Sequence, residues 1–435
     1  MAQNYFDSEA ETASYESLRA IQSLRLIKTV EKCYANSSFY RQKFDELGIK
    51  PSDIKSIDDI SKLPFTVKSD FRENYPFGLF AVPREEIVRV HASSGTSGKQ
   101  TVVGYTRNDL DRWSNCIARA LAAAGITKND YVQISYGYGL FTGGLGMHYG
   151  VEKLGAKAIP TSTGKTSKQI ELMKDFRTNA LCCTPSYALY MAEKMNSMGI
   201  DPINDLDLRV GIFGGEAWSE QMRLQVEKEL GIKAYDIYGM SELQGPGVSF
   251  ECEAQSGMHI NEDYFYPEII DPVTLKPLKE GEFGELVFTC IGNEALPLLR
   301  YRTGDLTALY HEKCSCGRTL VKMKKLRGRT DDMLVIRGIN VYPSQIEHII
   351  LSLGLKPNYQ IIVDRKDNLD VLTINIEMSE SCFSDSVKGI EAREKIIRST
   401  MQEALMIMPI IKLVSPKSLP RYTGKASRII DNREF

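Results

Sequence analysis

The apolar residues of the chain follow a helical period at first and a strand–helix alternation further on. Between Ala13 and Leu47 they recur at helical spacing, and Gly48 and Pro51 then follow as stop signals. This pattern predicts one long N-terminal helix. The apolar residues at this spacing are Leu18, Ile21, Leu24, Ile27 and Val30.

From Tyr131 onwards, short β-rich segments alternate with helical ones. The β-rich segments are YVQISY, AKAIP, ALCC, RVGIF and KAYDIY. Such alternation favours a mainly parallel sheet covered by helices. Ligands of these sheets bind in loops beyond the carboxyl ends of the strands. We therefore expect the site in the loops after Tyr136, Phe213 and Tyr238.

Two further changes of pattern follow. After about Gly245, short strands punctuated by Pro and Gly predict a β-rich lobe. A basic stretch at 322–332 comes next, and about a hundred residues beyond it alternate strands and helices in a pattern of their own. The sequence therefore predicts an α/β protein whose last part is a small α+β domain.

Composition narrows the class of protein. Lys and Arg total 54 against 56 Asp and Glu in 435 residues, so the basic excess of a nucleic-acid-binding protein is missing. No apolar run approaches the ~18 residues that span a bilayer, and the polar, acidic N-terminus is unlike a signal peptide. Nine cysteines, an odd number, do not fit a secreted disulfide framework. We expect a soluble cytoplasmic enzyme without a nucleic-acid or membrane partner.

A loop rich in Ser, Thr and Gly lies at 93–99. Its glycines allow tight turns that bring N–H groups together, and its hydroxyls and Lys99 add donors, as in phosphate-binding loops. It is not a Walker A loop, because only two residues separate Gly95 from Gly98 and Gln100 follows the lysine. Taken alone, the segment fits a solvated loop equally well. Its central residues are Ser94, Gly95, Thr96, Ser97, Gly98 and Lys99.

Four later segments carry candidate chemistry, and each is weak in isolation. In YGMSE, Glu242 could hold Mg²⁺ beside nucleotide phosphates and Tyr238 could stack on a base, or the segment could be an ordinary strand exit. In YRTGD, Asp305 could accept both hydroxyls of a ribose or serve as a turn residue. GRTDD could be a charged linker, and the lysine of PRYTGK could be a surface residue.

The order of these segments is more specific than any one of them. The Ser/Thr/Gly loop, GGE, YGMSE, YRTGD, GRTDD and TGK follow one another as in the adenylate-forming superfamily, which the chain resembles over about residues 60–431. Within that superfamily the chain is similar to the phenylacetate–CoA ligase family. The segments that carry this resemblance are HASSGTSGKQTVVGYT, YGYGLFTGGLGMHYG, HINEDYFYPEIIDP, ALPLLRYRTGDL and GRTDDMLVIRGINVYPSQIE.

The resemblance implies an AMP-forming ligase. Phenylacetate, or a related aryl acid, would react with ATP to an acyl-adenylate and then with coenzyme A, giving phenylacetyl-CoA, AMP and pyrophosphate. The implied fold is a large N-terminal α/β domain (1–328) with mainly parallel sheets and a β-rich lobe, a hinge (329–332), and a small mobile α+β domain (333–435). The small domain would turn about Asp331. A homodimer is the expected assembly, since dimers are the commonest soluble oligomers.

The resemblance also implies roles for single residues. Lys425 would bridge the substrate carboxylate and the α-phosphate, with Ser241 near that phosphate and Glu242 on Mg²⁺. Arg329 would help Asp305 to bind the ribose. The loop Ser93–Lys99 would wrap the β- and γ-phosphates, and Gly338 would lie beside the pantetheine of coenzyme A. The remaining nucleotide contacts would come from Gly215, Glu216, Asp236, Tyr238, Gly239 and Met240.

The aryl-acid pocket would combine aromatic walls with glycines that leave room for a ring. The aromatics could instead simply pack a core, which is their commoner role. The residues assigned to this pocket are Tyr136, Phe141, Gly143, Gly144 and Gly214.

A Cys-x-Cys pair predicts a metal site. Cys314 and Cys316, with Cys252 and His259 upstream, supply four ligands in two clusters, which suits a closed tetrahedral Zn²⁺ site of structural type. Many members of the family lack the cysteine pair, whereas a histidine in the HINED context is common. His259 could therefore serve near the active site instead, and the four residues could be unconnected.

Two other functions remain open at this point. The chain could adenylate another aryl acid and load it onto a carrier-protein thiol. It could also be a zinc-stabilised homologue without catalytic activity, although the set of Glu242, Asp305, Arg329 and Lys425 speaks against that.

Overall fold

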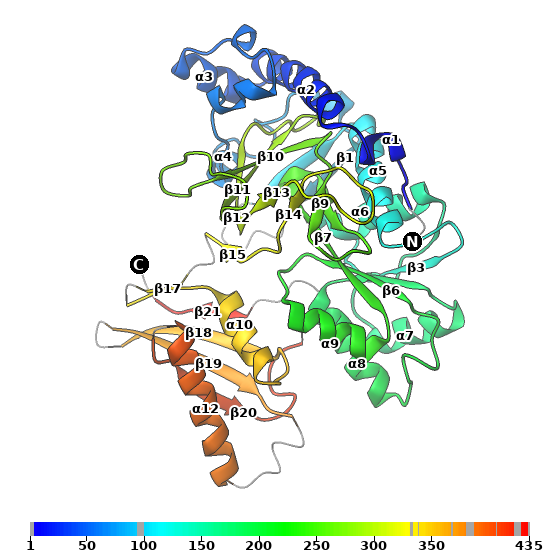
Figure 1. Cartoon of the computed structure of the whole chain (residues 1–435), viewed down its shortest axis with the longest axis vertical. Helices are drawn as coiled ribbons and strands as arrows, with labels where there is room; N and C mark the ends of the chain where they lie inside the picture. The colour runs from blue at the N-terminus through cyan, green and yellow to red at the C-terminus, as the bar shows by residue number, and fades with distance from the viewer. Residues whose placement is uncertain are drawn as a thin grey trace.

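The computed structural model describes residues 4–93, 100–330, 334–337, 339–366, 369–379, 387–405, 407–421 and 428–433. They form a large N-terminal part and a smaller C-terminal part that lie side by side (Figure 1). The large part ends at β15 (Gly328–Arg329) and the small part begins at β16 (Leu334–Ile336). The predicted α/β fold class is confirmed. No helix in these ranges has the length and apolar character needed to cross a membrane.

The N-terminal segment differs from the single helix that its spacing predicted. It forms α2 (Tyr15–Asn36) and α3 (Ser38–Leu47), separated by Ser37 in an extended conformation. Ile21 and Leu24 are exposed, at 37% and 62%. The buried face instead includes Gln22, whose amide donates to the main-chain oxygen of Glu262 over 3.1 Å. The buried face of this helix therefore includes a polar residue that has a hydrogen-bond partner, and it differs from the face that apolar spacing alone indicates.

A nine-stranded sheet forms the centre of the large part, as far as it is described. In spatial order its strands are β13 (Leu309–Tyr310), β14 (Lys322–Met323), β9 (Met258–Ile260), β8 (Gly245–Glu251), β7 (Lys233–Met240), β6 (Val210–Gly214), β5 (Ala180–Cys183), β3 (Tyr131–Ile134) and β4 (Lys157–Ile159).

This sheet is parallel in one half and antiparallel in the other. The pairs from β4 to β7 are parallel, and the pairs from β7 to β13 are antiparallel. The predicted strand–helix alternation matches the parallel half, where β5 and β6 are buried at every residue, as expected for strands covered on both faces. The main helices of this region are α5 (Arg107–Ala123), α6 (Thr142–Leu154), α7 (Thr166–Asp175), α8 (Pro185–Ser197) and α9 (Glu220–Leu230).

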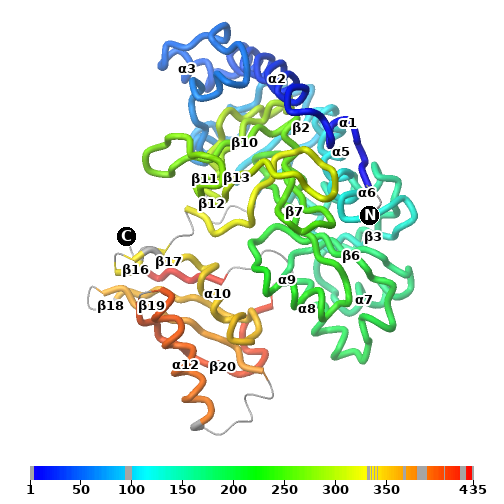
Figure 2. The backbone as a smooth tube through the Cα atoms, in the orientation of Figure 1, coloured from blue at the N-terminus to red at the C-terminus, as the bar shows by residue number. Residues whose placement is uncertain are grey.

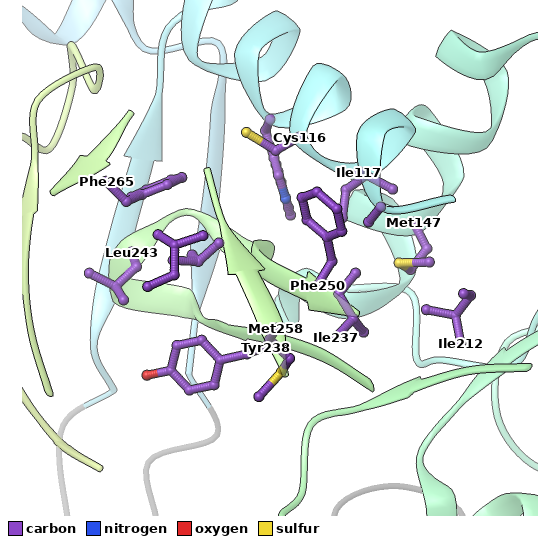
Figure 3. Packing of buried hydrophobic residues seen from close by; sticks show 14 of the residues in the cluster. Cys116, Ile117, Met147, Ile212, Ile237, Tyr238, Leu243, Phe250, Met258 and Phe265 are labelled. Carbon is purple, nitrogen blue, oxygen red and sulfur yellow. The ribbon is translucent and has the colours of Figure 1, made fainter. Parts of the chain in front are cut away.

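The core between this sheet and its helices is apolar and continuous. Cys116 and Ile117 on α5 and Met147 on α6 lie opposite Ile237 and Phe250 of the sheet (Figure 3). Burial of such side chains is the main favourable term in folding. The packing fixes the strand ends that carry the candidate site.

The predicted β-rich lobe is an antiparallel sheet of β10 (Phe265–Ile270), β11 (Gly284–Cys290), β12 (Tyr301–Thr307) and β15. The register of β12 and β15 sets Asp305 opposite Arg329. A separate hairpin joins β1 (Arg89–Ala92) to β2 (Val102–Tyr105). The short helices of the large part are α1 (Ser8–Glu11), α4 (Lys68–Glu73) and the 3₁₀ turns Pro51–Asp53, Ile57–Lys62, Arg84–Glu86 and Ser241–Leu243.

The small part has a sheet and a core of its own. Its four-stranded sheet, among the described residues, has the order β20-β19-β18-β21, and its core draws on residues from Leu334 to Ile411. Figure 2 shows this part, coloured from yellow-orange to red, gathered at the lower left of the view. Its elements are β16, β17 (Ile339–Val341), α10 (Pro343–Ser352), β18 (Tyr359–Lys366), β19 (Leu369–Glu377), α12 (Val387–Leu405), β20 (Ile410–Val414) and β21 (Ile429–Asp431).

Candidate active site and a cysteine–histidine cluster

Tyr238, Asp305 and Arg329 form one hydrogen-bonded unit. The hydroxyl of Tyr238 donates to Oδ2 of Asp305 over 2.7 Å, and Nη1 of Arg329 donates to Oδ1 over 2.6 Å. Nη2 of Arg329 also donates to the main-chain oxygen of Thr303. Burial, followed by the charge of Asp305, raises the pKa of the Tyr238 hydroxyl. The structure thus brings together three residues that the sequence assigned to the nucleotide, and fixes the Asp305 carboxylate from two sides.

The segment after β7 turns tightly. A Cβ atom at Gly239 would lie 1.9 Å from the main-chain oxygen of Gly245, so only glycine fits there. The turn buries Ser241 and Glu242. The hydroxyls of Ser241 and Thr142 lie 3.3 Å apart. Thr142 was missed from sequence, although it stands in the FTGG segment that the resemblance covers.

Glu216 follows β6, and Asp236 lies within the neighbouring strand β7, opposite Phe213. Gly215, with a φ of +85°, turns the chain after β6, and Oε1 of Glu216 accepts from the main-chain N–H of Ser186 over 2.7 Å. Burial, followed by the nearby Glu251 carboxylate, raises the pKa of Asp236 to about 7. A carboxyl group whose pKa is raised towards neutrality marks this part of β7 as electrostatically unusual.

Glu251 is itself held by a buried ion pair that sequence reasoning missed. Its carboxylate accepts from both Nη atoms of Arg223 over 2.7 Å each, and also from the main-chain N–H of Asp236. Because the two partners stand 28 residues apart on α9 and β8, no local pattern pointed to them.

Two of the residues assigned to the acid pocket, Tyr136 and Gly214, meet at the carboxyl ends of β5 and β6. The buried Tyr136 hydroxyl lies 2.6 Å from the main-chain oxygen of Cys183 and 3.2 Å from that of Gly214, which ties three strand ends together. A Cβ atom at Gly143 would lie 2.4 Å from the Phe141 ring. At Gly214 it would lie 2.2 Å from the main-chain oxygen of Ile237. These glycines therefore permit close packing, and Phe141, at 43% exposure, is the accessible aromatic of the set.

Several assigned residues lie outside the described residues. They are Ser94, Gly95, Thr96, Ser97, Gly98 and Lys99 of the Ser/Thr/Gly loop, Asp331 of the hinge, Gly338, and Lys425.

The four predicted zinc ligands converge. One ligand atom from each of Cys252, His259, Cys314 and Cys316 lies within 4.8 Å of the others. The Sγ atoms of Cys252 and Cys314 are 3.6 Å apart, and Nε2 of His259 is 3.4 Å from Sγ of Cys316. Pairing of β9 with β14 explains this, because it carries the β13–β14 loop onto His259.

The donor set of this cluster fits a tetrahedral metal. The Nδ1 atom of His259 lies 3.3 Å from the main-chain oxygen of Leu320, so Nε2 faces the thiols with its lone pair. Cys252, His259 and Cys314 are buried, and Cys316 is half-buried. Three thiols and one imidazole within this distance are the ligands of a closed structural zinc site.

The N-terminal residues cover this cluster, a contact that no sequence pattern indicated. We call residues 4–12 the strap. The hydroxyl of Tyr5 donates to the main-chain oxygen of Cys316 over 2.8 Å, and the buried Glu11 carboxylate accepts from Nε of Arg318 over 2.6 Å. Asp7 pairs with the buried Arg119 over 2.6 Å. The strap is therefore anchored by three of its side chains, two of which hold the segment of Cys316 and Arg318.

Known proteins resemble this chain in sequence and in fold. Residues 338–433 match the family model of the AMP-binding enzyme C-terminal domain. The chain is 47% identical to a phenylacetate–coenzyme A ligase of Thermus thermophilus, over 99% of this chain and 100% of that protein. It is also 47% identical to a phenylacetate–coenzyme A ligase of Escherichia coli, over 98% and 97%.

A solved structure of a 2-hydroxyisobutyryl-CoA ligase in the postadenylation state, in complex with R3-HIB-AMP, has a TM-score of 0.92 at 30% identity, over 99% of this chain and 93% of that one. The same ligase with 2-HIB-AMP and CoA in the thioesterification state has a TM-score of 0.73 at 31% identity, with the same coverage. Because the sequence relatives match over nearly their full length, the chain belongs to the phenylacetate–coenzyme A ligase family of adenylate-forming enzymes.

Proposed function

We propose that this protein joins phenylacetate, or a closely related aryl acid, to coenzyme A through an acyl-adenylate. The observation that carries the proposal is the identity of 47% to phenylacetate–coenzyme A ligases over nearly the whole chain. The unit of Tyr238, Asp305 and Arg329 supports it, because its central carboxylate can accept from vicinal hydroxyls of a ribose.

Two half-reactions follow from this proposal. First, a carboxylate oxygen of the acid attacks the α-phosphorus of ATP, the bond to the β-phosphate oxygen breaks, and pyrophosphate leaves. The coenzyme A sulfur then attacks the acyl carbon as a thiolate. The bond from that carbon to the phosphate oxygen breaks, AMP leaves, and the thiol proton passes to solvent.

The first step needs cations because it brings one anion onto another. Lys425 would bridge the two anions, with Ser241 near the α-phosphate and the loop Ser93–Lys99 on the other phosphates. Glu242 would hold a Mg²⁺ ion that neutralises phosphate charge, a role suited to its carboxylate at the end of β7. Gly215, Glu216, Asp236, Gly239 and Met240 would complete the nucleotide site.

The acid would lie near the ends of β5 and β6, with Phe141 beside its ring. Tyr136, Gly143 and Gly214 would shape this pocket through the close packing described above. Gly338 would line the path of the coenzyme A pantetheine. The proposed division is a large domain at 1–328, a hinge at 329–332 around Asp331, and a mobile domain at 333–435.

We further propose that Cys252, His259, Cys314 and Cys316 hold a structural Zn²⁺ ion. Four ligands within 4.8 Å leave no open position, so the metal would brace the large domain and take no part in the reaction. Elemental analysis of protein purified without added metal tests this. About one zinc per chain is expected, and less than about a tenth would rule the site out, since structural sites bind tightly. The homodimer and the cytoplasmic location remain predictions.

The activity is tested by ATP–pyrophosphate exchange over a panel of aryl, arylacetic and short aliphatic acids. AMP release is followed with and without coenzyme A. Exchange with phenylacetate and AMP release that depends on coenzyme A are expected. Exchange without coenzyme A turnover would instead indicate a carrier-protein acceptor, and no exchange with any acid would contradict the proposal.

A further inference from the structure

A cleft separates the two parts of the molecule. Helices α8 and α9 line one wall, and residues 356–360, 419–421 and Arg428 line the other. Near it, α10 contacts α9, and Leu351 packs against the core of the α8–α9 region. The small part therefore docks directly on α8 and α9 (Figure 1).

Arg421 reaches across this cleft. Its Nη1 and Nη2 atoms donate to the Glu377 carboxylate of the small part over 2.8 and 2.6 Å. Its Nε atom lies 3.6 Å from Oε2 of Glu193 on α8 of the large part. Because Glu377 holds the guanidinium in place, the Nε side is directed at Glu193. The two side chains are only 19% and 29% exposed, so water screens the pair in part.

A second arginine repeats this arrangement in part. Arg428, which also lines the cleft, donates to Glu347 of the small part over 2.7 Å. In the sequence, Arg421 and Arg428 stand on either side of Lys425. Each arginine is thus anchored on an acid of its own part, and Arg421 also faces an acid across the cleft.

The arrangement of the two parts matches one state of a relative. The TM-score to the 2-hydroxyisobutyryl-CoA ligase is 0.92 in its postadenylation state and 0.73 in its thioesterification state. We propose that Glu193 and Arg421 are a docking pair that holds the small part in the orientation for adenylate formation. This rests on the proposed function, since it assigns the pair to one half-reaction. Both are positioning residues, because neither needs to touch a reacting atom.

Charge variants of Glu193 test the pair without disturbing the contact between Arg421 and Glu377. Glu193→Gln should lower phenylacetate-dependent ATP–pyrophosphate exchange about two- to fivefold, as expected for a partly exposed ion pair. Glu193→Lys should lower it further, because it faces Arg421 with a like charge. Thioester formation from preformed phenylacetyl-adenylate and coenzyme A should keep its wild-type rate. Equal loss in both half-reactions, or no loss, would overturn the proposal.

Glu229 supplies the matched control. It lines the same cleft from α9 and accepts from Gln225 on its own helix. Glu229→Gln and Glu229→Lys should leave both half-reactions unchanged, and an effect equal to that of the Glu193 variants would overturn the assignment to a specific pair.

Hydrogen exchange tests docking independently of catalysis. In Glu193→Lys, amides of α8 and of residues 353–360 should exchange faster than in wild type, whereas Glu229→Lys should leave them unchanged. Unaltered exchange in Glu193→Lys would overturn the docking pair. If wild-type protein has no exchange activity with any acid, the proposed function fails, and the docking pair is then decided by hydrogen exchange alone.

Discussion

At the scale of single residues, Asp305 is the centre of the nucleotide site that we propose. Its two oxygens already accept from Tyr238 and Arg329, so its carboxylate is oriented before a ribose arrives. Asp305→Asn removes the charge from this position. Loss of a charge-assisted hydrogen bond is worth roughly 1.5–3 kcal/mol, so we expect ATP to bind about 10- to 100-fold more weakly in calorimetry.

Asp175→Asn, on the exposed end of α7, is the control for this change and should bind ATP as the wild type does. Thermal unfolding of both variants separates lost affinity from lost folding. ATP binding by a folded Asp305→Asn protein at wild-type affinity would contradict the assignment of Asp305 to the ribose.

Asp236 gives a pH prediction. Burial, followed by Glu251, raises its pKa to about 7 in the folded protein, against about 3.9 in an unfolded chain. The folded state therefore holds the proton more tightly. The stability contributed by Asp236 is complete below about pH 4 and is lost as pH rises to about 7. Asn cannot ionise. As the pH rises from about 5 to about 8, the free energy of unfolding of Asp236→Asn should therefore increase by roughly 1–3 kcal/mol relative to that of the wild type.

Urea unfolding at the two pH values measures this gain, with Asp175→Asn as the exposed control that should show none. A stability difference between Asp236→Asn and the wild type that is the same at both pH values would mean that Asp236 does not titrate in this range.

Residue-level prediction from sequence was possible where the segments are long and ordered, and stopped where contacts join distant elements. The order of YGMSE and YRTGD placed Tyr238 and Asp305 in one site, but their hydrogen bond depends on how two sheets meet. The ligand types predicted that Cys252 and His259 would lie close to Cys314 and Cys316. The pairing of β9 with β14 is what brings them together. The contact of Glu193 with Arg421 depends on how two domains dock, which no local pattern encodes.

At the scale of elements, the strap shows how a short segment can be fixed by buried charge. Glu11 and Arg318 are both almost fully buried, and Glu11 also accepts from the main-chain N–H groups of Phe6 and Asp7 over 2.9 and 2.8 Å. Removing one partner of a buried pair leaves the other uncompensated, which costs about 3–5 kcal/mol. Glu11→Gln should therefore lower the free energy of unfolding by about that amount and expose Cys316 to thiol reagents.

Glu9→Gln is the matched control, because Glu9 lies on the same short helix and is exposed. It should change neither the unfolding free energy nor the rate of thiol modification. Wild-type thiol reactivity in Glu11→Gln would show that the strap does not protect the cluster.

Element prediction succeeded best in the parallel half of the central sheet. There the helices cover both faces of a parallel sheet, so its strands are apolar throughout and its helices are amphipathic. This alternation is visible directly in the sequence. It was only partly right for α2, where Leu18 and Val30 are buried but Ile21 and Leu24 are exposed and Gln22 is buried. A hydrogen bond to a residue 240 positions away decided that face, and apolar spacing cannot register such a partner.

At the scale of the whole molecule, the distribution of apolar cores differs between the two parts. The core of the small part is built from residues of that part alone, from Leu334 to Ile411. The largest core of the other part joins residues as far apart as Leu18 and Met323. The small part can therefore bury its apolar surface without help, whereas a fragment of the large part would expose half of a shared core.

We accordingly expect the isolated segment 333–435 to fold and the segment 1–240 to remain unfolded. Cutting at 240 separates β7 from β8, and so removes the antiparallel half of the central sheet together with its core residues. Circular dichroism and amide dispersion in NMR spectra measure both fragments under one condition. A cooperative thermal transition is expected for 333–435 alone. A disordered segment 333–435, or a segment 1–240 that unfolds with equal cooperativity, would mean that the two parts depend on each other for folding. The boundary of a rotating small domain would then have to lie elsewhere than at the proposed hinge.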